Sequence, residues 1–496
     1  MTVFVAGALL MTYEIIGSRI LAPFIGTSTY VWTSLIGVIL ASLSLGYWLG
    51  GRLADRRPEV RILAAVLFLA GSFVSITVLI NEIALSFIAS APVGVELRSV
   101  IAALILFAPA SVCLGIVTPY AVKLRMGVLE DVGKTVGRLY ALSTVGSIAG
   151  TFFAGFFLIP FVGSLRTLYL VAGALLGLSV LLVPIAISQS NIAGTLLLLV
   201  AIGWSEAAAG INAAAYDLHD IDTEYSRVQV FNTVDRHGRP MRAMSTDPYA
   251  IQSAILFDSD EPALEYGRFY HLARYFDPGF REVLVVGGAG YSTPKEFLRR
   301  YPDVHVDVAE IDPAMTDIAR KYFRLRDDQR LNIIHEDGRT YLNRASRGKY
   351  DIVLMDAFGS MFTVPYQLTT VEAARRIYDS LDEKGVVIFN LGSSITGKGS
   401  GFFRAELATY RSVFADVLLF KVRPEKSDDS LQNLILVGLK THPNGPLTAS
   451  EEEIADLLDH IYQIDLRSDL PILTDDLAPV EYYNSIAQDE FLRSRR

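Results

Sequence analysis

Long apolar runs fill the first two hundred residues of this chain. They cover about 2–21, 29–51, 61–80, 97–118, 138–160 and 164–187. Because about 20 apolar residues are enough to cross a bilayer as a helix, each run predicts one membrane span. A seventh run, about 191–205, is short and meets Glu206. This part of the chain is therefore predicted to be a multi-pass α-helical membrane domain of roughly six to eight spans.

Basic residues in two short loops predict how these spans are oriented. One group lies between the second and third runs, and the other between the fourth and fifth: Arg52, Arg56, Arg57 and Arg61, then Lys123, Arg125, Lys134 and Arg138. Loops rich in Arg and Lys stay in the cytoplasm, which puts the start of the chain and the end of the sixth span inside. A complete seventh span would carry the following domain outside. If the seventh segment instead lies in the membrane interface, or if residues 62–91 contain an extra crossing, the following domain would lie inside.

Small and ionisable residues inside the apolar runs suggest how the helices pack and what they do. A stripe of small residues predicts close helix packing: Ser143, Gly146, Ser147, Gly150 and Gly155. Glu14 and Arg19 lie in or near the first span, where ionisable groups are costly and often functional. They suit either a transport role or mutual pairing.

From about residue 217 the pattern changes to strands. Residues 225–234 alternate like a strand, 235–238 supply a turn, and 240–245 return as its partner. Residues 262–276 then place apolar and aromatic side chains at helical spacing, which predicts a helix. A small antiparallel β-subdomain is therefore expected at about 211–260, after a membrane domain at 1–210.

The remaining residues, 261–496, alternate between strands and helices. Strands are predicted at 282–286, 304–309, 331–335, 350–355 and 385–390, and helices at 293–301, 313–323, 338–345 and 370–382. Such alternation predicts a doubly wound parallel sheet, a Rossmann-like domain of the methyltransferase type. Ligands of such sheets bind beyond the carboxyl ends of the strands.

Charge and cysteine content exclude some functions. The chain has 44 basic and 53 acidic residues, and mean hydropathy is +0.36. The residues beyond 200 hold 33 basic and 46 acidic side chains, so no nucleic-acid partner is expected. Such a field attracts a cationic substrate. The single cysteine, Cys113, excludes disulfides within the chain and thiolate metal sites.

Glycines and acids follow four successive predicted strands. They are Gly287, Gly288 and Gly290, then Glu310, Asp337 and Asp356. Glycines let a ligand approach the backbone, and an acid after the second strand accepts from ribose hydroxyls. Asp337 is placed to accept from an adenine amino group, and Asp356 to face the reacting atoms. Glu310 or Asp337 alone is equally compatible with capping the helix that follows it.

Residues 217–496 resemble the polyamine (spermidine) synthase family of aminopropyltransferases, in its membrane-fused branch. The similar stretches are 224–230, 285–290 (Val-Val-Gly-Gly-Ala-Gly), 309–312 (Ala-Glu-Ile-Asp), 336–339 (Glu-Asp-Gly-Arg), 350–358, 365–370 and 473–481. Two positions depart from the family pattern. Ala289 stands where the glycine loop usually has an aspartate that holds amines, and Gly359 where a second acid follows the catalytic one. Asp475 and Asp476 could supply the negative charge that these two positions lack, or they could be ordinary loop or cap residues.

The resemblance implies transfer of the aminopropyl group of decarboxylated S-adenosylmethionine to an amine, without a metal. Asp356 is the implied catalytic base. Gly287, Gly288, Gly290, Glu310, Asp337 and Gln252 would hold the nucleoside, and Tyr225, Tyr266 and Asp356 the amine. The altered acids make putrescine, cadaverine and agmatine all candidate acceptors.

The resemblance also implies a homodimer. A cytosolic donor implies a catalytic domain on the cytoplasmic side of the plasma (inner) membrane, with lipid as a partner.

Two other functions stay open from the sequence. An S-adenosylmethionine-dependent methyltransferase shares the sheet and the strand-end acids, although the β-subdomain and the surroundings of Asp356 argue against it. A polyamine transporter or sensor with a silent soluble domain is compatible with the missing acids.

Overall fold

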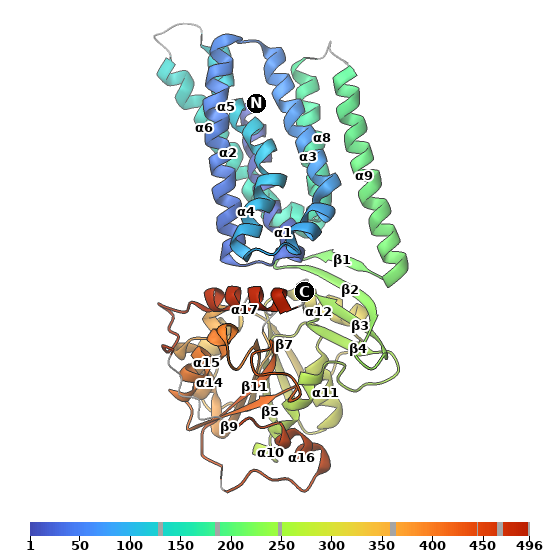
Figure 1. Cartoon of the computed structure of the whole chain (residues 1–496), viewed down its shortest axis with the longest axis vertical. Helices are drawn as coiled ribbons and strands as arrows, with labels where there is room; N and C mark the ends of the chain where they lie inside the picture. Colours follow the sequence, from blue (N-terminus) through green and yellow to red (C-terminus); the bar gives the residue numbers. More distant parts are fainter. Residues whose placement is uncertain are drawn as a thin grey trace. The chain divides into compact units, whose positions relative to one another are not determined.

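The computed structural model describes the whole chain except residues 127–131, 184–188, 247–249, 358–363, 444, 464–469 and 495–496. The chain forms two compact units, Met1–Val228 and Gln229–Arg496. The first unit is mainly helical, and the second contains a large sheet with helices around it (Figure 1).

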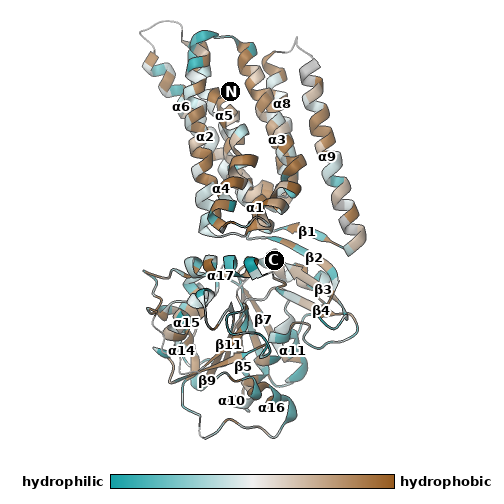
Figure 2. Cartoon of the chain, viewed as in Figure 1, coloured by the Kyte–Doolittle hydropathy of each residue, from teal (hydrophilic) through white to brown (hydrophobic). Residues whose placement is uncertain are grey.

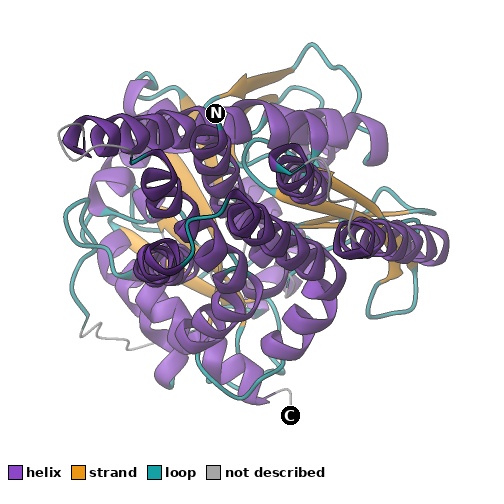
Figure 3. Cartoon of the chain, turned by 90° about the horizontal axis from the view of Figure 1, so that it is seen from above, coloured by secondary structure: helices purple, strands orange, loops and turns teal. Residues whose placement is uncertain are grey.

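The first unit is built from long helices that run roughly along one direction in Figure 1 and are seen close to end-on in Figure 3. They are α1 Thr2–Ile25, α2 Thr29–Arg56, α3 Val60–Ala89, α4 Val95–Leu106, α5 Ala108–Arg125, α6 Val132–Phe153, the π-helix η2 Ala154–Leu158, α7 Ile159–Val162, α8 Ser164–Leu182 and α9 Gln189–Tyr216. Among the described residues, 5 helices are long and apolar enough to cross a membrane, or 6 if the bent pair α4–α5 is one span. Brown, hydrophobic residues dominate these helices in Figure 2.

Within the described residues, all seven apolar runs lie mainly on helices of this unit. The alternative of an extra membrane crossing within 62–91 is wrong, because α3 is one helix of 30 residues. The seventh run belongs to α9, whose apolar part, Ile192–Ala208, is shorter than the five candidate spans. The side on which the second unit lies remains a prediction.

The fourth predicted span is broken rather than straight. Helices α4 and α5 meet at Phe107 with a bend of 56°. Pro109, in the first turn of α5, lacks the N–H that would continue the helical ladder. The carbonyl of Leu106 at the break accepts hydrogen bonds from the hydroxyls of Tyr13 and Thr77, each at 2.7 Å. Neighbouring helices thus satisfy the freed backbone group, which would otherwise lack a partner in an apolar interior.

The predicted close packing of small residues occurs between α1 and α6. A Cβ added to Gly146 would lie 2.0 Å from the Phe4 carbonyl oxygen, and one on Gly150 would lie 2.2 Å from that of Ala8. Gly155 does not take part, since nothing lies within 4 Å of its Cβ position. On α1, the Arg19 guanidinium donates to the backbone carbonyl of Glu224.

Two sheets follow the helices. The smaller has the order β1-β2-β3-β4, with β1 His219–Asp222, β2 Arg227–Val234, β3 Pro240–Ser245 and β4 Ser253–Leu256. The two predicted strands match β2 and β3, which pair antiparallel. The predicted helix at 262–276 begins later and is mostly 3-10: η3 Glu265–His271 precedes a short α10 Leu272–Phe276.

The larger sheet has the order β10-β11-β9-β8-β5-β6-β7. Its strands are β5 Glu282–Val286, β6 His305–Glu310, β7 Leu331–His335, β8 Tyr350–Met355, β9 Leu381–Ser393, β10 Asp416–Lys421 and β11 Gln432–Leu439. Helices and turns between them are α11 Ser292–Arg300, α12 Pro313–Tyr322, α13 Gly338–Arg344, η4 Tyr366–Leu368, α14 Val371–Ser380, η5 Lys398–Ser400 and α15 Gly401–Arg411. Two helices, α16 Glu452–Asp459 and α17 Val480–Ser494, follow the sheet.

The five predicted strands are present and run parallel, from β9 to the edge strand β7. The sequence reasoning missed two further strands, β10 and β11, and these are antiparallel: β11 pairs with β9, and β10 with β11. The central strands are buried almost throughout, as strands covered by helices on both faces are.

Candidate functional site

The register of the parallel strands brings the predicted site residues to one edge. Val286 pairs with both Ala309 and Met355, so β5, β6 and β8 end at the same level. Glu310 pairs with His335 on the next strand. Gly287, Glu310, Asp337 and Asp356 therefore emerge side by side at the carboxyl edge, where ligands of such sheets bind.

The glycine loop is tightly fitted to its neighbours. Gly287 has φ 99°, and a Cβ there would lie 2.5 Å from the backbone oxygen of Asp356. A Cβ on Gly290 would lie 2.6 Å from the Ser253 hydroxyl oxygen. At position 287, only glycine combines a positive φ with so close an approach to the backbone. The glycines thus let the loop approach Asp356 and β4 directly.

Glu310 holds the glycine loop in place. Its Oε2 accepts hydrogen bonds from the backbone N–H groups of Gly288 (2.8 Å) and Ala289 (3.0 Å). Its Oε1 accepts from the N–H of Asp312 at 2.9 Å. Burial raises the pKa of Glu310, and these three donors oppose that shift. The side chain is therefore a loop anchor, a role that its sequence position did not indicate, and contact with a ribose remains a prediction.

Asp337 caps the helix that follows it, as one of the two interpretations expected. Its Oδ1 accepts from the backbone N–H of Thr340 at 2.9 Å and from the Thr340 hydroxyl at 3.2 Å. Asp312 caps α12 in the same way by accepting from the Ala314 N–H. Both bonds to Asp337 use one oxygen, so the cap leaves Oδ2 available to a ligand amino group.

Asp356 directly follows β8 and lies among uncharged polar groups. The Asn390 side-chain amide donates to its Oδ1 at 3.4 Å, and the phenols of Tyr266 and Tyr270 lie close to the carboxyl. Although part of the side chain is exposed, the carboxyl is desolvated by its neighbours. Burial raises the pKa of Asp356 from 3.8 to about 7, and the interactions with Tyr270, Asn390 and Tyr266 act in the opposite direction. A carboxylate with a pKa near neutrality is suited to take up a proton.

Asn390 is a site residue that the sequence reasoning missed. It lies on β9, and its Oδ1 accepts from the Asn433 amide on β11 at 2.9 Å. The Asn433 bond fixes which side of the Asn390 amide faces Asp356. The signal was present, because Asn390 interrupts an otherwise apolar run, 386–391, in the centre of a buried sheet.

The other predicted residues are only partly brought together. The Tyr266 hydroxyl donates to the backbone carbonyl of Gln252 at 3.2 Å. The side chain of Gln252 turns to Thr246, whose N–H it accepts at 2.7 Å. Tyr225 belongs to the first unit and is 50% exposed, so its place in the amine site remains a prediction. Gly359 lies outside the described residues.

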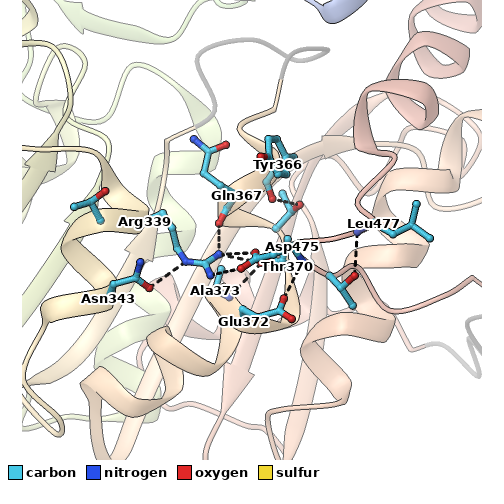
Figure 4. A network of polar contacts seen from close by, with 12 residues as sticks. Arg339, Asn343, Tyr366, Gln367, Thr370, Glu372, Ala373, Asp475 and Leu477 are labelled. Carbon is cyan, nitrogen blue, oxygen red and sulfur yellow. Dashed lines mark hydrogen bonds and ion pairs between the residues drawn. The ribbon is translucent and has the colours of Figure 1, made fainter.

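Asp475, proposed as a substitute for the missing acids, is already engaged. It forms a two-pronged ion pair with Arg339, with N–O distances of 2.9 and 2.6 Å (Figure 4). The pKa of Asp475 is lowered by Arg339, against the effect of its burial. Its charge is thus neutralised within the fold. Asp476 is exposed.

No metal site is formed by the part of the chain that the structure describes. Within it, no three His, Cys, Asp or Glu side chains are grouped as an ion would require.

The second unit is similar to known proteins. A family model for the spermine/spermidine synthase domain matches residues 267–419, which run from η3 to β10. A polyamine aminopropyltransferase of Vibrio vulnificus is 34% identical over 171 residues, which are 34% of this chain and 54% of that protein. The matched region thus spans about half the length of that relative.

A longer match reaches beyond the second unit. Polyamine aminopropyltransferase 1 of Streptomyces coelicolor is 24% identical over 400 residues, covering 72% of this chain and 68% of that protein. Because Gln229–Arg496 makes up a smaller share of the chain than this, the match includes part of the helical unit. Among solved structures, a probable spermidine synthase from Corynebacterium glutamicum is 20% identical, with a TM-score of 0.42, and the match covers 54% of this chain and 94% of that one.

Proposed function

We propose that this chain, a member of the spermine/spermidine synthase family through its residues 267–419, transfers an aminopropyl group from decarboxylated S-adenosylmethionine to an amine. The observation that carries the proposal is Asp356. It is a desolvated carboxyl with a raised pKa, beside a glycine loop, at the carboxyl edge of the sheet.

The reaction is a direct displacement at carbon. The nitrogen of the amine forms a bond to the propyl methylene next to sulfur, and the carbon–sulfur bond breaks. The electron pair stays on sulfur, which leaves as methylthioadenosine. A sulfonium is already a good leaving group, so the chemistry asks the protein mainly to prepare the nucleophile.

The nucleophile must lose a proton first. An alkylammonium has a pKa of about 10.4, and only the neutral amine attacks. Because the pKa of Asp356 is about 7 rather than 3.8, the proton transfer is much less uphill than to an ordinary aspartate. Asp356 would also hold the nitrogen in line with the methylene, and alignment of this kind is a large part of catalysis.

The nucleoside is assigned to the neighbouring strand ends. The glycine loop 287–290 gives the donor access to backbone, and Glu310 and Asp337 would accept from ribose hydroxyls and the adenine amino group. Glu310 acts in part by keeping that loop in position. Gln252, Tyr225 and Tyr266 are proposed to complete the nucleoside and amine sites.

The acceptor is proposed to be a diamine or a related amine, with putrescine, cadaverine and agmatine as candidates. The tyrosine phenols and the Asn390 amide beside Asp356 bring no negative charge. Neither the glycine loop 287–290 nor the stretch 357–371 contains an acid, so Asp356, which directly precedes that stretch, is the acid proposed to meet a cationic acceptor.

The helical unit is proposed to hold the enzyme in the plasma (inner) membrane, with the second unit in the cytoplasm as a homodimer. Large apolar side chains lie exposed on its helices, as a lipid environment allows. Examples are Leu40, Phe87, Phe156, Leu181 and Leu199.

The test is product identification with the purified full-length protein in detergent. Decarboxylated S-adenosylmethionine is supplied with each of the three amines, and products are identified by mass. We expect an aminopropylated amine together with methylthioadenosine, and far less of both with Asp356→Asn. A methylated amine from S-adenosylmethionine would instead establish a methyltransferase. Labelled amine flux into proteoliposomes without any product would establish a transporter.

A further inference from the structure

Near this edge of the sheet, the side chain of Arg339 donates hydrogen bonds to four residues. Its Nη1 donates to the Gln367 carbonyl (2.8 Å) and the Thr370 hydroxyl (3.1 Å), and the guanidinium grips Asp475 with both terminal nitrogens. Its Nε donates to Asn343 at 3.2 Å. Figure 4 shows the guanidinium at the centre of this network, with Asp475 and Thr370 on the side away from Asn343.

The partners of Arg339 come from three separate segments. Arg339 itself is in the first turn of α13, two residues after the proposed adenine contact Asp337. Gln367 and Thr370 end the stretch that leaves the sheet at Asp356 and returns at α14. Asp475 follows Leu473, whose carbonyl accepts from the N–H of Val371 at 2.8 Å.

Asp475 is held from several directions. Its Oδ1 also accepts from the Thr370 hydroxyl at 2.7 Å, and its backbone N–H donates to Glu372 at 3.0 Å. Contacts with the start of α14 thus orient the Asp475 carboxylate toward Arg339. The planar guanidinium fits this arrangement because it presents parallel donors in a fixed fork, which a lysine ammonium does not.

Stability alone does not explain so specific an arrangement. The side chain of Asp475 is 45% exposed and that of Arg339 14%, so the two-pronged pair adds some stability to the fold, but stability does not require that it join these particular segments. What the contact does fix is geometry, since it locks the start of α13 to the return leg of the segment that begins at Asp356.

We propose that Arg339, held by Asp475, is a positioning residue for donor binding. It keeps Asp337 and the segment 366–370 in the relative arrangement that accepts the nucleoside. This inference rests on the proposed function, since the donor is the nucleoside of that reaction.

A matched control lies on the same helix. Arg344 makes a two-pronged pair with Glu336, through Nε and Nη2, and its side chain is 58% exposed. The pair joins residues 336 and 344, without reaching the segment after Asp356 or the stretch around 475. Arg344→Lys therefore removes a two-pronged arginine pair from α13 but leaves the contacts of α13 with the segment 366–370 and with Asp475 in place.

The experiment compares Arg339→Lys, Asp475→Asn, the double variant and Arg344→Lys in the full chain. Binding of methylthioadenosine is measured by calorimetry, KM and kcat are measured for decarboxylated S-adenosylmethionine, and thermal unfolding is followed in parallel. We expect Arg339→Lys and Asp475→Asn each to weaken nucleoside binding and raise KM about tenfold, with kcat and Tm changed little. The double variant should be no worse than either single one, because both remove the same contact.

Two results would overturn the inference. The first is wild-type nucleoside affinity in both single variants, which would leave the proposed function intact. The second is a loss of nucleoside affinity in Arg344→Lys as large as in Arg339→Lys, or a loss of affinity across the variants that parallels their loss of Tm. If the wild-type protein itself binds no nucleoside, the proposed function fails and takes this inference with it. Asp475→Asn keeps the size of the side chain and serves if Arg339→Lys does not fold.

Discussion

The side-chain amide of Asn390 on β9 donates a hydrogen bond to the carboxylate of Asp356, which follows the adjacent strand β8. This contact joins a residue that the sequence singles out to one that it does not. It also connects the proposed base to a second amide, Asn433, one strand further on.

The pH dependence of the reaction should report this contact. Asp356 must be ionised to accept a proton, so kcat/KM should rise with pH through its pKa of about 7 in the free enzyme. Asn390 donates to the ionised form and so lowers that pKa. Asn390→Ala should therefore move the rising limb to higher pH, as measured by the kcat/KM profile. Asn433→Ala, which disturbs only the orientation of Asn390, should move it less, and a limb that stays in place in both variants would contradict the assignment.

Replacement of Asp356 should separate activity from stability. Asp356→Asn should reduce kcat by about 10²–10⁴, the usual contribution of a general base, with methylthioadenosine affinity nearly unchanged. Wild-type turnover in this variant would show that Asp356 is not the base.

The same variant should gain stability at high pH. Because the folded-state pKa of Asp356 is raised from 3.8 to about 7, the fold binds this proton more tightly than the unfolded chain does. That contribution is complete below about pH 4 and is lost as pH rises through 7. Asn carries no such loss, so Asp356→Asn should raise the free energy of unfolding at pH 8 by on the order of 1–3 kcal/mol, since one pKa unit corresponds to about 1.4 kcal/mol. Denaturant titrations at pH 8 and pH 4 check this, and an equal effect at both would refute it.

Glu310→Gln should weaken nucleoside binding by disturbing the glycine loop. Both carboxylate oxygens accept backbone N–H groups, and the Gln amide nitrogen would face at least one of these donors. We expect at least tenfold weaker binding of methylthioadenosine by calorimetry. Glu406→Gln is the matched control, because this acid is fully buried and its oxygens have no hydrogen-bond partner among the described residues. Burial raises the pKa of Glu406 well above its ordinary value, which favours the uncharged form, so the uncharged glutamine should leave binding unchanged.

In the helical unit, Gly146→Ala should destabilise the packing of α1 against α6. The added Cβ would collide with the Phe4 carbonyl at 2.0 Å, and overpacking of this kind costs about 1–3 kcal/mol. Gly137→Ala on the same helix meets nothing within 4 Å and removes a poor helix former. Thermal unfolding in detergent should show a lower Tm for the first variant and an equal or higher Tm for the second. Equal losses in both would mean that the two helices do not approach as described.

The sequence determined the elements of this protein because their signals are local. Continuous apolar runs give the helices of the first unit, and short apolar strands between amphipathic helices give β5 to β8 with nearly correct bounds and the central part of β9. The strand-end positions of Gly287, Glu310, Asp337 and Asp356 follow from the same pattern, because parallel strands end at one edge.

Tertiary structure decided what these side chains touch, because contacts between distant segments leave no periodic trace in the sequence. The antiparallel edge β10–β11, the break at Phe107, the hold of Glu310 on the glycine loop and the fork of Arg339 on Asp475 all join residues far apart in the chain. The pKa of Asp356 depends on such contacts as well. It is set by desolvation together with Tyr266, Tyr270 and Asn390, which only folding brings to the end of β8.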